Sequence, residues 1–286
     1  MIRIIPIAVL ALATGCLAAA GEDGSPLPDK SIYTLFNPTP DSLLRELAPD
    51  RPDKTDGPYT VDAGHFQWEM DFANYTTTDN DGLKLNAWNV APFKFRVGLL
   101  DNVEFQVSYD SYLNIFTRND LTGTTSRQSG FGDLTPRFKI NLWGNNGGST
   151  AFSLFPFVKF PMNTAGLGNN AIEGGLGLPL AIKLPHDFDL GLETVAGIFQ
   201  NDRDSEYHAD FANSITLDHS LAGKLSAYLE FFSDISTERH AAWIGTVDTG
   251  LEYMLSENVQ LDCGCNFGVT HAAAAYNPFA GITIRF

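Results

Sequence analysis

Apolar and polar residues alternate with a period of two from residue 65 to residue 286, in twelve separate stretches. The last stretch is the clearest, with apolar residues at every second position: Ala280, Ile282, Ile284 and Phe286. A period of two is typical of β-strands that have one apolar and one polar face. No stretch after the first twenty residues is long and apolar enough for a spanning helix. The sequence therefore predicts an all-β chain.

Short and long links alternate between the predicted strands. The strands cover residues 66–72, 85–97, 103–110, 133–142, 152–160, 176–184, 189–193, 211–217, 225–231, 243–253, 259–269 and 280–286. Links after even-numbered strands are tight turns, whereas most others are longer and polar, with the longest loop predicted over residues 111–129. Outer-membrane barrels have this pattern, and their short turns are periplasmic. The sequence thus predicts a transmembrane antiparallel up-and-down β-barrel of about 12 strands over residues 65–286.

Phe286 stands at the end of the last predicted strand. Chain ends of soluble domains are usually frayed and polar. This stretch resembles the closing strand of an outer-membrane barrel, in which a terminal aromatic residue is an assembly signal. We expect it to pair with the first strand, and we expect the outer-membrane barrel assembly machinery and the lipid bilayer to be partners. A soluble antiparallel sandwich is the alternative, because it also produces alternation.

Residues 1–20 have the features of a signal peptide. Arg3 supplies a positive charge, an apolar stretch follows, and Ala18-Ala19-Ala20 fits a cleavage site. A lipoprotein signal that ends at Cys16 is the alternative. The formal net charge of −16 disfavours a nucleic-acid partner. Export and a barrel together predict the cell outer membrane as the location.

Residues 21–64 are rich in proline and show little alternation. Thr39 followed by Pro40 and Asp41 predicts the start of a short helix. The charged run at residues 50–56 fits neither helix nor strand. It is interpreted either as a periplasmic tail or as a plug inside the barrel, and the plug candidates are Arg51, Asp53 and Lys54. As a plug, Asp53 is expected to pair with lumen cations such as Lys94, Arg96 or Arg137.

Charged residues of both signs lie on the polar faces of the predicted strands, and an outward apolar face would turn them into the lumen. The candidates are Glu69, Asp71, Lys84, Lys94, Arg96, Glu104, Asp133, Arg137, Lys139, Lys159 and Arg285. Neighbouring strands carry alternating signs, which favours cross-strand pairs. Arg285 is expected beside the acids of the first strand. The charges either form a polar, field-lined channel or simply fill a narrow barrel with ion pairs.

Several motifs resemble one family. Asp50-Arg51-Pro52-Asp53-Lys54-Thr55, Ala63-Gly64-His65-Phe66-Gln67, Gly132-Asp133-Leu134 and Asn141-Leu142-Trp143-Gly144 occur in this order, and Pro156-Phe157-Val158-Lys159-Phe160-Pro161 follows. They are similar to the outer-membrane transporter family named for the meta-pathway of phenol degradation. The resemblance runs from about residue 50 to residue 286. It implies a Gram-negative outer-membrane barrel that passes aromatic hydrocarbons, and it brings no catalytic residues.

No enzyme, cofactor or metal site is predicted. Gly175-Leu176-Gly177 has no following helix and cannot be a dinucleotide loop. Cys263 and Cys265 are interpreted as small apolar residues on the lipid face, since no His or Cys nearby would complete a metal site.

The predicted function is passive uptake of small molecules, aromatic or hydrophobic ones among them. A structural or surface barrel without transport is one alternative. A surface-acting lipid hydrolase is another, and it would need a Ser–His pair.

Overall fold

The structure is a computed structural model that describes residues 29–201 and 204–286. The predicted signal peptide and Cys16 lie outside these residues. Within the described part of the chain, no helix has the length and apolarity needed to cross a membrane.

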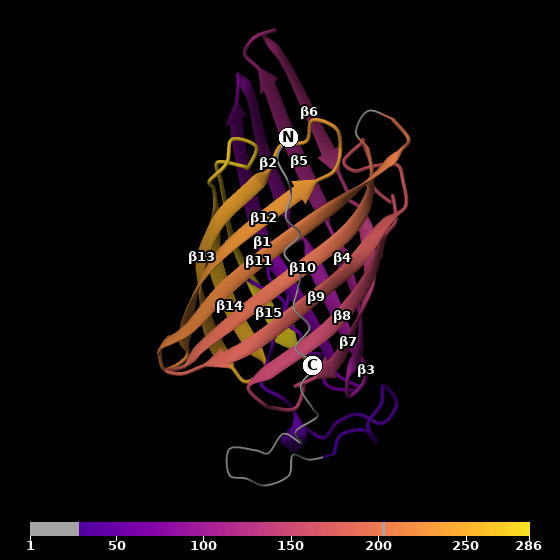
Figure 1. Cartoon of the computed structure of the whole chain (residues 1–286), viewed down its shortest axis with the longest axis vertical. Coiled ribbons are helices and arrows are strands. Elements are labelled where there is room, and N and C mark those ends of the chain that lie inside the picture. Colours follow the sequence, from indigo (N-terminus) through magenta and orange to yellow (C-terminus); the bar gives the residue numbers. More distant parts are fainter. Residues whose placement is uncertain (1–28, 202–203) are drawn as a thin grey trace, which may run out of the picture.

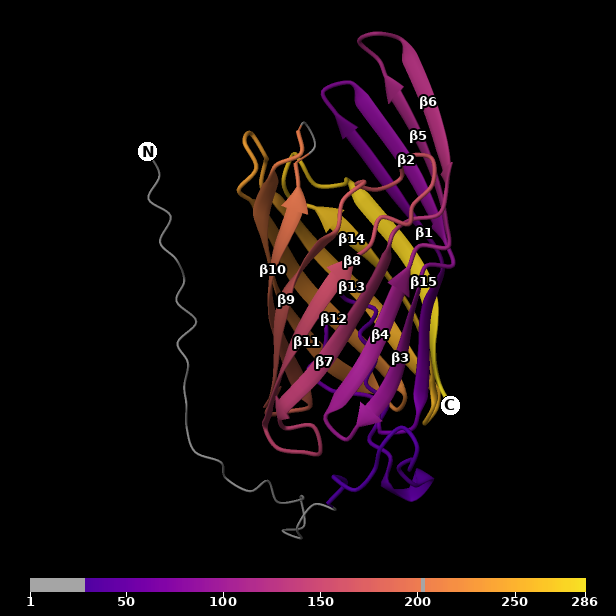
Figure 2. The same cartoon turned by 90° about the vertical axis from the view of Figure 1, so that its right-hand side faces the viewer.

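Twelve strands form a closed antiparallel barrel, which confirms the predicted fold (Figures 1 and 2). They are β1 (Phe66–Asn80), β3 (Phe93–Leu100), β4 (Val103–Tyr109), β7 (Leu134–Trp143), β8 (Thr150–Lys159), β9 (Glu173–Leu184), β10 (Phe188–Gln200), β11 (Tyr207–Ala222), β12 (Leu225–Ser236), β13 (Ile244–Ser256), β14 (Val259–Gly268) and β15 (Tyr276–Arg285). β15 pairs with β1 and closes the ring, with Gln67 opposite Arg285. Closure leaves no free sheet edge around the ring, as a barrel in lipid requires.

Three further strands extend the sheet beyond one side of the barrel. They are β2 (Leu83–Val90), β5 (Tyr112–Asn119) and β6 (Thr124–Gly130). β2 pairs with the far half of β1, β5 pairs with β2, and β6 pairs with β5. Figure 2 shows that this extension leans away from the barrel. Its strands continue into β3, β4 and β7 across short breaks at residues 91–92, 110–111 and 131–133.

The loop predicted over residues 111–129 is therefore wrong, because most of it forms β5 and β6. Nearly every residue of β6 is exposed. Alternation depends on one buried face, and a strand that meets solvent on both faces does not show it. Gly123, with a φ of 69°, supports the turn between the two strands.

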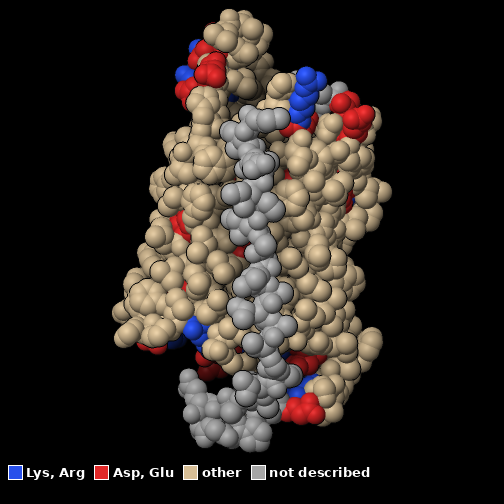
Figure 3. Space-filling view, viewed as in Figure 1, with Lys and Arg blue, Asp and Glu red and all other residues tan. Residues whose placement is uncertain are grey.

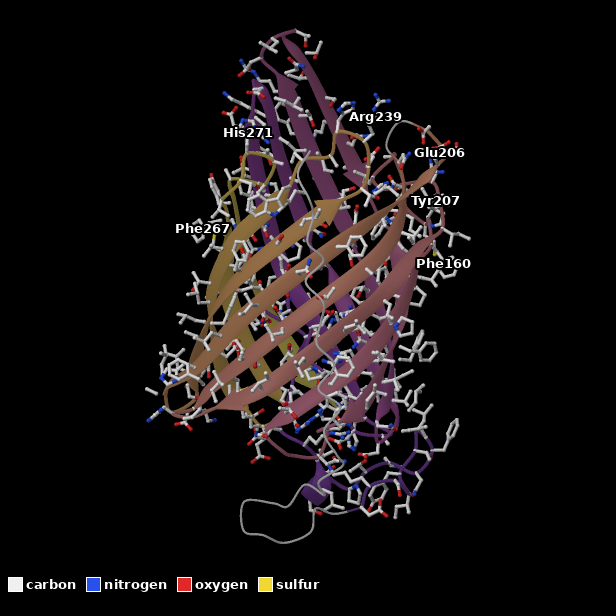
Figure 4. All side chains as sticks on the ribbon, in the orientation of Figure 1. Phe160, Glu206, Tyr207, Arg239, Phe267 and His271 are labelled. Atoms are coloured by element: carbon white, nitrogen blue, oxygen red, sulfur yellow. The ribbon has the colours of Figure 1, made fainter. Side chains whose placement is uncertain are left out.

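Apolar side chains cover the outside of the barrel, and charged side chains lie inside. Phe72 and Leu229 are 52% and 56% exposed, whereas Arg96 and Glu104 are completely buried. On the visible face in Figure 3, charges gather near the two ends and the wall between them is mostly uncharged. Figure 4 places Phe160, Tyr207 and Phe267 on the outer surface and Glu206, Arg239 and His271 at the loop end. This distribution is the reverse of a soluble core and suits a barrel surrounded by lipid.

The two cysteines share the outer surface. Both Cys263 and Cys265 are free. They occupy alternate positions of β14 that also include the exposed Phe267.

Residues 29–64 lie at the short-turn end of the barrel and enter it from there (Figure 2). The helix predicted from Thr39 is wrong, since only one turn of 3-10 helix forms, η1 (Asp41–Leu43), without a side-chain cap. The backbone N–H of Arg45 donates to Asp62 (2.8 Å), and its guanidinium donates to Asp101 (3.1 Å). These contacts hold the chain at the rim, and it continues in extended form toward the lumen.

Candidate functional site

Residues 50–56, here called the lumen segment, lie inside the barrel and connect its opposite sides. Asp50 and Asp56 bind the cations of β3 and β7, whereas Arg51 and Lys54 bind carboxylates of β1, β13 and β14. The charges of these four residues thus match the charges of the wall that each of them faces.

Asp50 is the most highly connected residue of the lumen segment. Its carboxylate accepts hydrogen bonds from Lys139 and from Gln106 (2.9 Å), and it lies 3.4 Å from both Arg96 and Lys94. Burial alone would raise the pKa of the Asp50 carboxyl, but the surrounding cations hold this pKa well below its usual range. Asp50 is therefore an anion that four cations of the wall share.

Asp56 makes a second anchor on the same side. Its carboxylate lies 2.7 Å from Arg137 and 2.8 Å from Lys94, and its backbone N–H donates to Glu193 (2.9 Å). Burial opposes ionisation here too, yet Arg137 and Lys94 lower the pKa of the Asp56 carboxyl. Asp50 and Asp56 make the pairings that the sequence suggested for Asp53.

Asp53 lies on the other side of the lumen, among acids. Burial raises the pKa of its carboxyl well above the usual range, and the carboxylates of Glu230, Asp218 and Glu252 raise it further. The expected pairing of Asp53 with Lys94, Arg96 or Arg137 is therefore wrong. The alternating charges of the segment did not reveal which acid faces which wall.

The wall residues form a continuous network around the segment. Arg96 donates to Glu69 (2.8 Å) and to Glu104 (3.0 Å), and its guanidinium also reaches the carbonyls of Ala48 and Tyr59. Nearer the loops, Lys159 pairs with Asp133 (3.5 Å) and with Glu173. Glu69, Asp71, Lys94, Arg96, Glu104, Asp133, Arg137, Lys139 and Lys159 all have ion-pair partners inside the barrel.

Two of the expected lumen cations lie elsewhere. Lys84 is on the extension, where it pairs with Asp120 (3.1 Å) and is half exposed. Arg285 is at the short-turn rim, where it donates to Asn258 (2.8 Å) and to the carbonyl of Arg45 (2.7 Å). The sequence predicts one strand over residues 85–97 and does not show that its first part, β2, belongs to the extension, so Lys84 was expected in the lumen. Arg285 does lie beside β1, opposite Gln67, but its guanidinium binds these rim acceptors and not the acids of that strand.

A set of acids on β10 to β14 was not recognised in the sequence. The set comprises Asp189, Glu193, Asp218, Glu230, Asp248, Glu252 and Asp262, here called the anionic half of the lumen. Lys94, Arg96, Arg137, Lys139 and Lys159 form the opposite, cationic half. These acids alternate with apolar residues that face outward, as Asp248 follows Val247 and Glu252 follows Leu251. This alternation is the sequence signal that could have placed them in the lumen.

A cavity of about 320 Å³ lies beside the lumen segment. Residues 50–53 form one side of it, and the others come from β1, β3, β4, β7, β14 and β15 and from the bend at Asp110 and Asp133. Phe279 of β15 brings an aromatic side chain, and Asn266 and Asn277 bring amides. Cavities of this size and mixed lining accommodate small organic molecules.

A closed barrel with an apolar outer band and a charged interior defines an outer-membrane β-barrel protein. The family model described as "Putative MetA-pathway of phenol degradation" matches residues 49–286. The chain belongs to this family, as the sequence motifs predicted, and its location is the outer membrane.

Two solved structures show the same fold. The COG4313 outer membrane channel from Pseudomonas putida F1 is 14% identical, with 83% of this chain and 100% of that chain covered and a TM-score of 0.60. The NanC porin is 7% identical, with 76% and 98% covered and a TM-score of 0.51. No curated protein matches the chain.

Proposed function

We propose that the protein is a passive outer-membrane channel for small solutes, aromatic and hydrophobic ones among them, and that the lumen segment is its plug. The observation that carries this proposal is the cavity of about 320 Å³ inside a closed barrel, bounded on one side by the lumen segment. The description of the family by phenol degradation and the naming of its structural relative as a channel support it.

The lumen segment is suited to release, because ion pairs and hydrogen bonds hold it rather than a packed apolar core. Both its entry point and the rim contacts of Arg45 lie at the short-turn end, so it can leave the lumen without breaking the ring. Ion pairs between wall and segment exchange more readily with solutes and water than close apolar packing does.

Single-channel conductance of the refolded, full-length protein tests this function. The double variant Arg51→Ala/Lys54→Ala removes both cations of the plug, and Arg239→Ala removes a cation at the loop end as a matched control. We expect larger or more frequent steps from the double variant than from the wild type and the control. Silence from all three, with insertion verified, would contradict the channel. If the channel conducts, liposome swelling with aromatic and aliphatic solutes of matched size would rank these solutes by their rate of permeation.

Catalysis is the less favoured function. A hydrolase needs a histidine free to accept a proton from its nucleophile. Both ring nitrogens of His208 are engaged, Nε2 with Asp210 (3.3 Å) and Nδ1 with Asn201 (2.9 Å). Over residues 29–201 and 204–286, no serine hydroxyl is hydrogen-bonded to a histidine. We therefore favour transport over hydrolysis, and the cavity inside the barrel favours transport over a purely structural role.

Phe286 is proposed as the signal for the barrel assembly machinery. Its backbone pairs with Phe66 through two hydrogen bonds of 2.8 and 3.2 Å, while its side chain is 67% exposed. We expect Phe286→Ala to lower the amount of folded barrel in outer-membrane fractions, because an exposed ring is available to a receptor. Phe267→Ala, on the outer face of β14, is the control. Equal folded levels in the two variants would refute the role of Phe286.

A further inference from the structure

The anionic half of the lumen contains carboxylates directly opposite one another on neighbouring strands. Asp189 faces Asp218, Glu230 faces Asp248, and Glu252 faces Asp262. Like charges in directly opposite positions destabilise a sheet. Such pairs therefore indicate that positive charge is brought to this wall, and the only Lys or Arg partners it has within the described residues are Arg51 and Lys54.

Arg51 occupies a guanidinium subsite. Its Nε and Nη2 donate to the two oxygens of Asp262 (2.8 and 2.5 Å), and its Nη1 lies 2.7 Å from Asp71. The guanidinium lies against Gly281, where a Cβ would collide with it. Two carboxylates in a fork arrangement, with a glycine that makes room, form a specific site for a planar cation.

Lys54 occupies an ammonium subsite. Its Nζ lies 2.7 Å from both Asp248 and Thr246, and 4.6 Å from the centre of the Phe232 ring. The Asp248 side chain is fully buried, whereas the Lys54 side chain is 30% exposed. A carboxylate, a hydroxyl and an aromatic face together recognise an alkylammonium group.

Both halves of the lumen lose partners when the lumen segment departs. Asp248 and Asp262 are left without any cation in the described part of the chain, and Lys94, Arg137 and Lys139 lose Asp50 and Asp56. Arg96 and Lys159 of the cationic half keep wall carboxylates as partners. The seven acids of the anionic half also outnumber the five cations of the cationic half. An open lumen therefore has an excess of carboxylates and attracts positive charge.

We propose that the subsites of Arg51 and Lys54 bind organic cations, amines and guanidines, which compete with the plug for them and pass through the channel in preference to carboxylates. This inference rests on the proposed function, since it names the solute class of that channel. An organic cation suits the subsites better than a metal ion, because the described residues contain no cluster of three metal-ligating side chains.

The first measurement is release of the plug, which does not depend on conductance. Because Lys54 is held inside the barrel by Asp248, trypsin is expected to cleave after it only when this residue leaves the lumen. Putrescine and guanidinium chloride, each added to the folded full-length protein, are expected to speed cleavage, whereas sodium succinate at equal ionic strength is not. Asp248→Asn weakens the hydrogen bond that holds Lys54, so it should be cleaved faster than wild type without putrescine, and the acceleration by putrescine should be about tenfold smaller. Asp79→Asn, on the exposed extension, should behave as wild type.

The second measurement is the reversal potential of the full-length protein in a potassium chloride gradient. We expect a potential of the sign that indicates potassium selectivity, and a shift toward zero in Asp248→Asn and Asp262→Asn. Equal effects of putrescine and succinate on cleavage, or a chloride-selective current, would overturn the cation sites while the channel stands. Absence of current in every form, with cleavage still accelerated by putrescine, would overturn the channel but leave the cation sites supported.

Discussion

Asp50→Asn is expected to release the lumen segment. Asp50 is 6% exposed and is the shared anion of Arg96, Lys139, Lys94 and Arg137. Removing one partner from a buried set of charges costs about 3–5 kcal/mol, because the remaining charges lose their compensation. A cost of this size moves the equilibrium between docked and released segment by more than about a hundredfold.

Trypsin cleavage after Lys54 measures this release. Asp50→Asn should be cut far faster than wild type, and Asp41→Asn, an exposed acid of the same N-terminal region, should be cut at the wild-type rate. The variant Asp50→Asn/Lys139→Met tests the physical reason, since it removes one of the cations left without a partner. It should be cut more slowly than Asp50→Asn alone. Equal cleavage of Asp50→Asn and wild type would contradict the role given to Asp50.

Plug docking is expected to weaken as the pH rises, and Asp53→Asn should remove most of this dependence. The pKa of the Asp53 carboxyl is raised in the docked state by burial and by Glu230, Asp218 and Glu252. A raised pKa means that docking takes up a proton. The stabilisation of the docked segment by protonated Asp53 is therefore complete below the ordinary carboxyl pKa. It is lost as the pH rises through the raised pKa of the docked state.

The two acids on the cationic half act in the opposite direction. The pKa values of Asp50 and Asp56 are lowered, so their contribution is present above the ordinary carboxyl pKa and is lost only as the pH falls below it. Wild-type conductance should accordingly be lowest at intermediate pH and should increase toward alkaline pH.

Single-channel recordings from acidic to alkaline pH would show this profile. Asp53→Asn should keep the channel closed at the alkaline end, and Asp79→Asn should follow wild type. An Asp53→Asn variant that opens at the same alkaline pH as wild type would rule out the proton on Asp53 as the cause.

The barrel could be predicted because lipid outside and charge inside impose alternation on every ring strand. Segments outside that environment gave no such signal. β5 and β6 lie outside the ring, and nearly all residues of β6 are exposed, so this stretch does not alternate. An extended path that depends on Arg45, Asp62 and Asp101 takes the place of the Thr39 helix. These contacts join residues far apart in the sequence, and helix propensity, which depends on neighbouring residues, does not predict them.

The lumen was predictable in kind and less so in detail. The charges of the ring could be expected from the alternating signs of neighbouring strands, whereas residues 50–56 are equally compatible with a periplasmic tail and with a plug. The surroundings of Asp53 could not be predicted, because Asp50 and Asp56 of the same segment can pair with the same cations equally well. The acids opposite one another, such as Glu252 and Asp262, follow from the register of the hairpin around residues 257–258. Register depends on turn geometry that periodicity does not specify.

The division of the lumen into a cationic and an anionic half has a consequence for how solutes travel. Opposite charges on facing walls produce an electric field across the channel, perpendicular to the direction of passage, once the plug has left. A small molecule with a permanent dipole would experience a torque there and align as it passes. Molecules of equal size would then differ in passage rate according to the direction of their dipole relative to their long axis. The barrel would thereby sort solutes by orientation as well as by diameter.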